Sequence, residues 1–330
     1  MLLGMNAIRH FAMSIAFGML AAANLHGRAL AADFPSRPVR WIMPFPPGGP
    51  SDVVARVLAQ RLGERLKQPV LVDNRAGASG AIGMEAAARA APDGHTIVFA
   101  APGTVVINPV LYKLNFDPLH DLAPVVQIAT FSFVLLAHPD FPARTIQELL
   151  AAAKAAPGAT TCGWGATLQQ LACEFLRLQG DAPIRIIPYK GSAPAMTDLV
   201  AGQINFLFEV TNIALPQVKA NRIRAIATTS SRRLAGPFGH LPTVAETLPG
   251  FGVEGWFGVL VPHATPRDVV VRLNHELAAV LEEVEVRKSL TDGGLEIAHG
   301  SPENFGDLLR RDHAKYSKII RKAGIKAEGP

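Results

Sequence analysis

Two glycine-rich turns are the most informative part of this sequence: PFPPGGPSD at residues 44–52 and RAGASG at residues 75–80. Each turn follows an apolar segment typical of a strand and precedes a segment typical of a helix. The N–H groups in a helix's first turn have no partner within the helix, and they carry the positive end of the helix dipole. Two such helix starts at one cleft would hold a carboxylate or a phosphate, so the turns predict a binding site for a small anion.

Short apolar segments alternate with helical patterns along the chain. Strands are predicted at 39–43, 70–72 and 96–100, with helices at 52–66 and 81–91 between them. In the first helix, apolar residues recur every fourth position, which gives the one-sided stripe of a helix that lies on a sheet. This βαβ rhythm predicts an α/β fold.

Two lobes are expected, because 330 residues exceed what one hydrophobic core usually organises. The apolar segments 131–137 and 256–261 stand at the two edges of the middle part of the chain, and we interpret them as crossings between the lobes. One lobe then comprises residues 33–125 plus 258–330, and the other comprises 126–257. A ligand would bind between them, at the carboxyl ends of both sheets.

The first 31 residues are typical of a cleaved signal peptide. Arg9 and His10 precede an apolar run at 11–23, and Ala29-Leu30-Ala31 has the small-x-small form of a cleavage site. Because the run is short for a membrane span, we expect export and a periplasmic protein, with a retained anchor as the alternative. Removal of Arg9 and Arg28 lowers the formal net charge from +5 to +3. The remaining lysines and arginines are scattered, and they come without a nucleic-acid-binding motif.

Cys162 and Cys173 are the two cysteines of the chain. In an oxidising compartment they could form a disulfide, but Cys173 falls on a predicted helix and pairing needs a close approach of the two Cα atoms. Two buried thiols are the expectation that this placement favours.

Several residues of the two turns have two interpretations each. Gly48 and Gly49 would let the backbone approach a ligand, or they would simply form a tight turn. Asp52 is expected to cap its helix rather than to face an anion. Ser79 would either donate its hydroxyl to a ligand oxygen or cap the next helix.

A third glycine turn, CGWGAT at 162–167, is predicted to close over the ligand from the second lobe. Trp164 would supply an apolar wall or pack in the core. Glu209, at the end of an apolar strand, would point into the cleft or stand at a solvated strand end.

Signals for catalysis are sparse. The stretch 77–81 misses the nucleophile-elbow pattern at its last position, and the sequence has neither a phosphate-loop lysine motif nor a dinucleotide fingerprint. The histidines are dispersed and no Cys-x-x-Cys pair occurs, so neither a metal nor a cofactor is predicted.

Motifs along the whole chain resemble those of the Bug receptors, the extracytoplasmic solute-binding proteins of tripartite tricarboxylate transporters. They are FPSRPVR at 34–40, the PGG turn that ends at Asp52, DNRAGASG at 73–80, APDG at 91–94, INP at 107–109, PYKGSAPA at 188–195, LPTVAE at 241–246 and WFG at 256–258.

The resemblance implies a type 2 periplasmic binding protein fold, in which two α/β lobes joined by two crossover strands close on a small carboxylated solute. In the family the first two turns hold one carboxylate, partly through ordered water, and the turn after the third strand, the second-lobe glycine turn and the strand end near Glu209 complete the cleft. The matching residues here are Phe45, Gly48, Gly49, Ser51, Asp52, Ala78, Ser79, Gly80, Thr104, Gly163, Trp164, Gly165, Gln170 and Glu209.

Three positions depart from the family's usual pattern. Gln170 stands in place of a frequent histidine, Glu209 in place of a frequent aspartate, and Ala81 in place of a frequent asparagine. Analogy therefore does not assign the ligand's far end, where we expect Trp164, Gln170 and Glu209 to select the ligand.

The expected function is a monomeric, non-enzymatic periplasmic receptor that captures a small carboxylate and delivers it to the membrane subunits of a transporter. One alternative is a receptor that signals through a membrane sensor kinase. A less favoured alternative is a secreted hydrolase or lyase on the same fold, for which the sequence offers no nucleophile and base.

Overall fold

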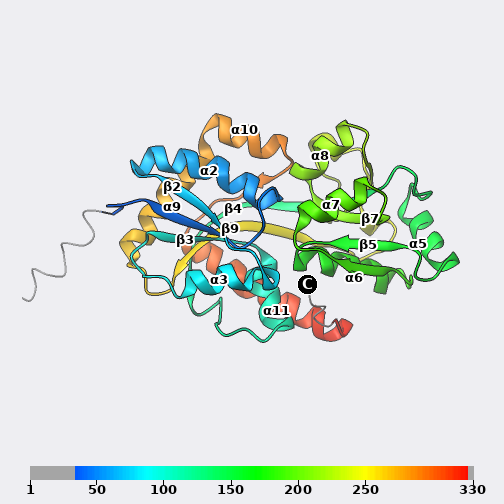
Figure 1. Cartoon of the computed structure of the whole chain (residues 1–330), viewed down its shortest axis with the longest axis horizontal. Helices are drawn as coiled ribbons and strands as arrows, with labels where there is room; N and C mark the ends of the chain where they lie inside the picture. Colours follow the sequence, from blue (N-terminus) through cyan, green and yellow to red (C-terminus); the bar gives the residue numbers. More distant parts are fainter. Residues whose placement is uncertain (1–33, 326–330) are drawn as a thin grey trace, which may run out of the picture.

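Two long strands, β4 (Leu122–Ala137) and β9 (Glu254–Pro262), pair antiparallel through the middle of the sheet (Figure 1). The structure is a computed structural model that describes residues 34–325. The expected signal segment at 1–31 lies outside these residues. Within the described part of the chain, none of the helices has the length and apolar character needed to cross a membrane.

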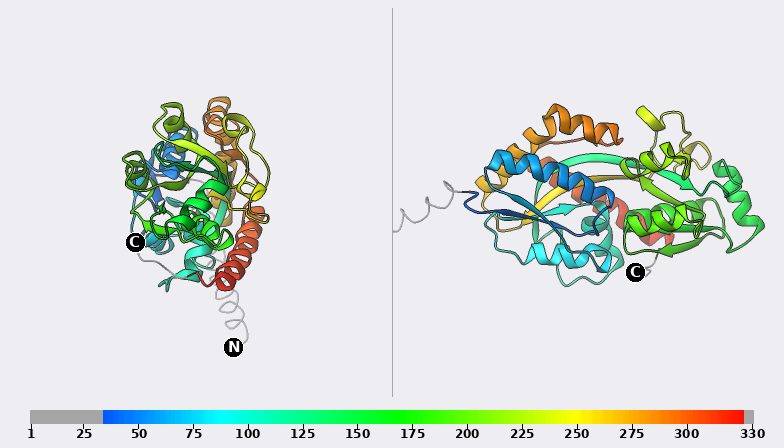
Figure 2. Two further views of the ribbon diagram at one scale, coloured as in Figure 1. Left: turned by 90° about the vertical axis from the view of Figure 1, so that its right-hand side faces the viewer. Right: turned by 45° about the horizontal axis from the view of Figure 1, so that its top comes forward.

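The first lobe extends the sheet beyond β9. Strands β1 (Val39–Met43), β2 (Val70–Asn74) and β3 (Thr96–Ala100) follow in the order β2-β1-β3, with β1 parallel to both neighbours and β3 antiparallel to β9. The helices of this lobe are α2 (Pro50–Leu66), α3 (Ala81–Ala88), α4 (Asn108–Leu111), α9 (Arg267–Glu282), α10 (Val284–Asp292) and α11 (Pro302–Ala323). Figures 1 and 2 show α2 and α10 on one side of the sheet, and α3 and α11 on the other.

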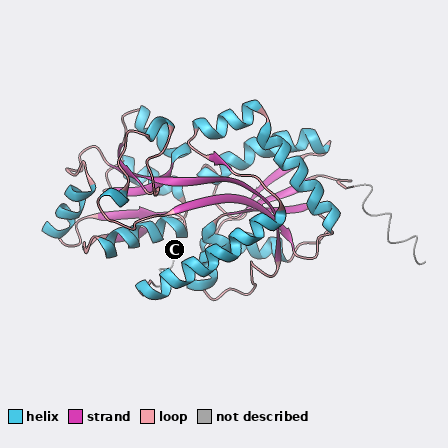
Figure 3. Cartoon of the chain, turned by 180° about the vertical axis from the view of Figure 1, so that it is seen from behind, coloured by secondary structure: helices cyan, strands magenta, loops and turns pink. Residues whose placement is uncertain are grey.

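The second lobe extends the sheet from the other edge of β4. Strands β5 (Thr161–Trp164), β6 (Arg185–Pro188) and β7 (Phe206–Val210) follow in the order β7-β5-β6, and β8 (Arg224–Thr228) also pairs with β4. Strand β7 is antiparallel to β4, whereas β5 is parallel to β6 and β7. Helices α5 (Ile146–Ala155), α6 (Thr167–Gln179), α7 (Ser192–Val200) and α8 (Thr211–Lys219) cover this part. Seen from behind, β4 and β9 span both lobes (Figure 3).

The predicted architecture of two α/β lobes joined by two crossing strands is confirmed. The exact lobe limits, 125/126 and 257/258, fall inside β4 and β9 and stay a prediction. Strand β4 begins at Leu122, nine residues before the predicted segment, because this earlier part already pairs with β9. The short strand β10 (Glu296–Ile297), which pairs with β4, was not predicted.

Cys162 of β5 and Cys173 of α6 form a disulfide, with their Cα atoms 6.1 Å apart. The expectation of two buried thiols was therefore wrong. Helix α6 packs back along β5, so its second turn lies beside the strand from which the chain has just come. The bond fastens the β5–α6 unit, whose connecting turn faces the other lobe.

Candidate ligand-binding site

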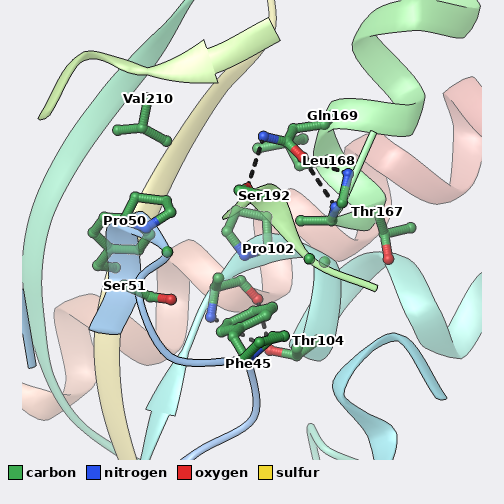
Figure 4. Close-up of a pocket in the computed structure, with 18 of the residues that line it drawn as sticks. Phe45, Pro50, Ser51, Pro102, Thr104, Thr167, Leu168, Gln169, Ser192 and Val210 are labelled. Carbon is green, nitrogen blue, oxygen red and sulfur yellow. Dashed lines mark hydrogen bonds between the residues drawn. The ribbon is translucent and has the colours of Figure 1, made fainter. Parts of the chain in front are cut away.

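A pocket of about 60 Å³ lies between the lobes, where the first residues of several helices meet (Figure 4). The first lobe contributes Gly49, Pro50 and Ser51 at the start of α2, and the second contributes 165–169 at α6 and 191–193 at α7. Val210, just before α8, completes the second-lobe wall. Among the residues that the structure describes, no Asp, Glu, Lys or Arg lines this pocket.

Helix dipoles therefore supply the positive potential of the pocket. The N-termini of α2, α6 and α7 carry partial positive charge that favours an anion, and the effect is strong where solvent is scarce. Two backbone N–H groups just before α6 already have an acceptor. Gln169 Oε1 lies 2.8 Å from Gly165 N and 3.0 Å from Ala166 N. The remaining donors of the wall are neutral, and they include the hydroxyls of Ser51, Ser79 and Ser192.

The second glycine turn has an unusual backbone. Four consecutive residues, 77–80, have positive φ angles, and two of them, Ala78 and Ser79, are not glycines. Successive residues in such conformations can turn their N–H groups into a concavity that suits an anion. Left-handed conformations of non-glycine residues cost stability and cluster at functional sites. Ser79 lines the pocket, its carbonyl accepts from Asn108 Nδ2 at 2.8 Å, and its side chain does not cap α3.

Asp52 lies behind the first glycine turn and not on the pocket wall. Its Oδ2 accepts from Gly48 N at 3.0 Å and from Arg56 Nε at 2.9 Å, and its Oδ1 accepts from Asn74 Nδ2 at 2.9 Å. Burial opposes ionisation, but these hydrogen bonds outweigh it and lower the pKa of the carboxyl group. The prediction that Asp52 caps the helix was wrong in detail, because Gly49 is the N-cap and Asp52 fixes the loop from the helix's first turn.

Replacing Asp52 with alanine should lower the free energy of unfolding at pH 7 by about 1–3 kcal/mol, because Gly48 N–H and the Asn74 amide lose their acceptor. Asp52→Asn keeps one oxygen acceptor and should cost less. Since the folded-state pKa is depressed, the ionised group stabilises the fold above its ordinary pKa of 3.8, and this contribution is lost as pH falls through the folded value. Urea unfolding at pH 7 and pH 3 measures both effects, and equal stability of wild type and Asp52→Ala at pH 7 would contradict them.

The turn after β3 supplies Gly103 and Thr104 through a π-helical turn at Gly103–Ile107. Thr104 Oγ1 donates to Ala101 O at 3.1 Å, so this hydroxyl is held by its own turn. Aromatic rings form the apolar part of the wall. Phe131 and Phe257, from the crossing strands, have ring centroids 4.5 Å apart, and Phe45 and Phe133 also line the pocket.

Ser192 and Gln169 are pocket residues that sequence reasoning missed. Gln169 Nε2 donates to Ser192 Oγ at 3.1 Å across the gap between α6 and α7 (Figure 4). Ser192 follows Gly191 in the stretch 188–195, which repeats the arrangement of strand, glycine and helix start found in the first two turns. The same rule would have identified it.

Glu209 and Gln170 are completely buried and lie outside the pocket wall. Glu209 Oε1 accepts from Val210 N at 2.8 Å, while Oε2 forms no hydrogen bond with any residue that the structure describes. Within the described part of the chain, neither the amide oxygen nor the amide nitrogen of Gln170 forms a hydrogen bond. The interpretation of Glu209 as a solvated strand end was therefore wrong.

Residues 162–167 were predicted to form a turn, but the first half of this segment belongs to strand β5. Gly163 and Trp164 belong to β5, where they pair with Ile187 and Pro188 of β6. Trp164 is 2% exposed and packs in the interior, and a Cβ at Gly163 would overlap Ile204. Of this turn, the pocket receives Gly165 and the residues after it.

The structure thus brings six of the predicted site residues to the pocket wall: Phe45, Gly49, Ser51, Ser79, Thr104 and Gly165. The other eight lie behind it or beside it: Gly48, Asp52, Ala78, Gly80, Gly163, Trp164, Gln170 and Glu209.

Direct contacts join the two lobes around the pocket. Thr167 Oγ1 of α6 donates to Asn108 Oδ1 at 2.8 Å, and Asn212 Nδ2 of α8 donates to Pro50 O at 3.2 Å. Gly191 approaches Pro46 so closely that a Cβ there would lie 2.8 Å from the proline ring. The lobes therefore meet on both sides of the pocket in this structure.

Comparisons with known proteins found a matching family model, similar sequences and similar solved structures. A sequence model described as the tripartite tricarboxylate transporter family receptor matches residues 54–325. The UPF0065 protein in the tcbD-tcbE intergenic region of Pseudomonas sp. strain P51 is 38% identical, with 91% of each chain covered. Protein BugT of Bordetella pertussis is 34% identical over 93% of this chain and 95% of its own. The solved structure of R. palustris Rpa4515 with adipate has a TM-score of 0.86 and 32% identity, covering 89% of this chain and 99% of that one. The likeness to such structures confirms the predicted fold class.

Proposed function

The chain belongs to the tripartite tricarboxylate transporter family of receptors, and we propose that it captures a small carboxylate in the interlobe pocket and delivers it to that transporter's membrane subunits. The family consists of solute-binding receptors, and a solved relative carries adipate. We infer export through a cleaved signal peptide at 1–31, a monomeric state and no enzymatic activity.

One observation carries the proposal. Three helix starts and Ser79, from the turn at 77–80 with its four positive φ angles, surround a pocket whose wall includes no Asp, Glu, Lys or Arg among residues 34–325. Such a site suits a carboxylate that is bound by neutral donors, because backbone N–H groups and hydroxyls satisfy its oxygens while the helix dipoles stabilise its charge. The phenylalanines beside the donors suit an aliphatic chain.

The site residues keep distinct proposed roles. Gly49, Ser51 and Ser79 would hold one carboxylate at the first lobe, with Gly48, Ala78 and Gly80 shaping the two turns around it. Thr104 and Gly165 would border the ligand's chain. Trp164, Gln170 and Glu209 would influence the ligand's far end from the layer behind the wall.

A thermal-shift screen tests this proposal. A ligand that binds only the folded chain raises the melting temperature, by an amount that grows with its concentration over Kd. The panel contains acetate, succinate, adipate, citrate, benzoate and glutamate, with the uncharged diol 1,6-hexanediol as the control for adipate. A shift with a carboxylate and none with the diol supports the proposal. A folded protein that responds to none of the carboxylates contradicts it.

The signalling alternative uses the same pocket and predicts the same shifts. Co-purification of the chain with the large transporter subunit, in the presence of the ligand found, favours transport. Binding to the periplasmic domain of a sensor kinase instead would favour signalling.

A further inference from the structure

Glu209 is an ionisable group behind the pocket, whose wall contains no Asp, Glu, Lys or Arg among the residues that the structure describes. It sits on β7 and is completely buried, one residue before the pocket residue Val210. The side chains of Ser192 and Gln169, which line the pocket, face its carboxyl group and favour its charged form. Among residues 34–325, Glu209 Oε2 nevertheless forms no hydrogen bond in this structure. The charge of Glu209 is therefore poorly compensated.

The hydrogen bonds of Gln169 fix what Ser192 can offer to a ligand. Because Gly165 N–H and Ala166 N–H both donate to Gln169 Oε1, the amide orientation is set and Nε2 donates to Ser192 Oγ at 3.1 Å. Ser192 then has a single hydrogen of its own. If Glu209 is ionised, this hydrogen turns toward the carboxylate, and Ser192 presents only a lone pair to the pocket. If Glu209 is protonated, it can donate to Ser192 Oγ, and the serine hydrogen is free for the ligand.

The charged side chains on the neighbouring elements do not stabilise an ionised Glu209. The titratable groups on elements packed against β7 are Glu174 and Arg177 on α6, Asp198 on α7 and Lys219 on α8. Glu174 pairs with Arg177 at 2.6 Å, Asp198 accepts from Tyr189 at 2.8 Å, and Lys219 is exposed. None of them acts on Glu209 by charge, and β5 and residues 133–137 of β4 carry no titratable group. Burial raises the pKa of Glu209 to about 7.

We propose that Glu209 is a positioning residue that takes up one proton when a dicarboxylate binds, so that Ser192 donates its hydroxyl hydrogen to the ligand's second carboxylate. This inference rests on the proposed function. The proton comes from solvent and stays on Glu209. In the complex, the protonated carboxyl group donates a hydrogen bond to Ser192 Oγ, and the Ser192 hydroxyl donates its own hydrogen to the bound dianion. Without that proton, two carboxylates would lie on either side of one serine, in a pocket to which the described part of the chain contributes no Lys or Arg side chain.

Isothermal titration calorimetry with adipate between pH 6.5 and 8.5 tests the inference. The probe stays ionised over this range, because ordinary carboxyl pKa values lie near 4. For wild type we expect Kd to rise about 25-fold between pH 6.5 and pH 8.5, the change expected for a site that must be protonated and has a free-state pKa of about 7. Repetition in buffers with different ionisation enthalpies should give an uptake that approaches one proton per ligand at pH 8.5.

Matched variants separate the mechanism from a structural role. Glu209→Gln keeps the shape and donates an amide hydrogen to Ser192 at every pH, so its Kd should be independent of pH, with no proton uptake. Ser192→Ala should weaken binding most at pH 6.5. Glu174→Gln, a change at another buried glutamate that lies outside the pocket, should retain the wild-type pH dependence.

A ligand-free measurement distinguishes this inference from the proposed function. A raised pKa makes the fold most stable below the ordinary value of 4.5, and this stability is lost as pH rises toward about 7. Glu209→Gln should remove this dependence of stability on pH, whether or not adipate binds.

Two results would overturn the inference alone. One is binding of adipate with the same pH profile in wild type and Glu209→Gln. The other is tighter binding of glutamate than of adipate at pH 8.5, which would mean that an ionised Glu209 pairs with an ammonium group. Failure of every carboxylate to bind overturns the proposed function, and the inference with it.

Discussion

Gly165→Ala is expected to weaken carboxylate binding at least about 100-fold, the effect of losing one or two hydrogen bonds to a charged group. A Cβ at Gly165 would lie 2.1 Å from Gly191 C, 2.3 Å from Gly191 O and 2.4 Å from Ser192 N. These are backbone atoms, which cannot move aside as the end of a side chain can. The added methyl group must push apart the turns that begin α6 and α7, and both turns line the pocket.

Gly252→Ala is the matched control, because a Cβ there meets no atom within 4 Å and its φ angle is not positive. It should leave both affinity and melting temperature within error of wild type. Gly165→Ala should also lose stability, so its affinity is measured by calorimetry at a temperature where circular dichroism shows a folded protein. A folded Gly165→Ala variant that binds adipate as wild type does would place the ligand elsewhere.

Loss of the disulfide between Cys162 and Cys173 is the largest expected change in stability. Closing the short loop between these residues, which are 11 positions apart, restricts the unfolded chain and contributes about 3 kcal/mol. Both residues are fully buried, so the double variant Cys162→Ala/Cys173→Ala also leaves a small cavity. The effect on ligand affinity should be smaller, because neither cysteine lines the pocket.

Urea unfolding of wild type with and without a reductant measures this contribution. The unfolding midpoint should fall when wild type is reduced, and the double alanine variant should not respond to the reductant. An identical midpoint for oxidised and reduced wild type would mean that the bond contributes nothing to stability.

The first lobe was predictable because its local signals agree with its tertiary context. The apolar segment at 39–43 is β1, the stripe of the first helix faces the sheet, and the segment at 96–100 is β3. Helix α8 was missed because Pro216 lies within it, and α10 was missed because its pattern is mostly polar. In both helices, contacts with the rest of the fold override weak local preference.

The candidate site was predictable where a glycine precedes a helix start, as at Gly49 and Ser79. It was not predictable where a residue's role depends on whether its side chain lies on the pocket wall or is buried behind it. Sequence places Glu209 at the end of a strand, but only the packing of α6 and α7 shows that Ser192 and Gln169, which line the pocket, also act on the Glu209 carboxyl group. Similarly, the disulfide depends on how α6 returns along β5, a long-range feature that the spacing of the two cysteines leaves open.

The crystal structure of the chain with adipate bound tests the central claim most directly. We expect one carboxylate at the start of α2 beside Ser79, the methylene chain against the phenylalanines, and the second carboxylate within hydrogen-bond distance of Ser192 Oγ, with no Lys or Arg side chain in contact with the ligand. A ligand held by arginines elsewhere, such as Arg232 and Arg311 in the groove beside α11, would contradict the claim that this pocket binds carboxylates through neutral donors.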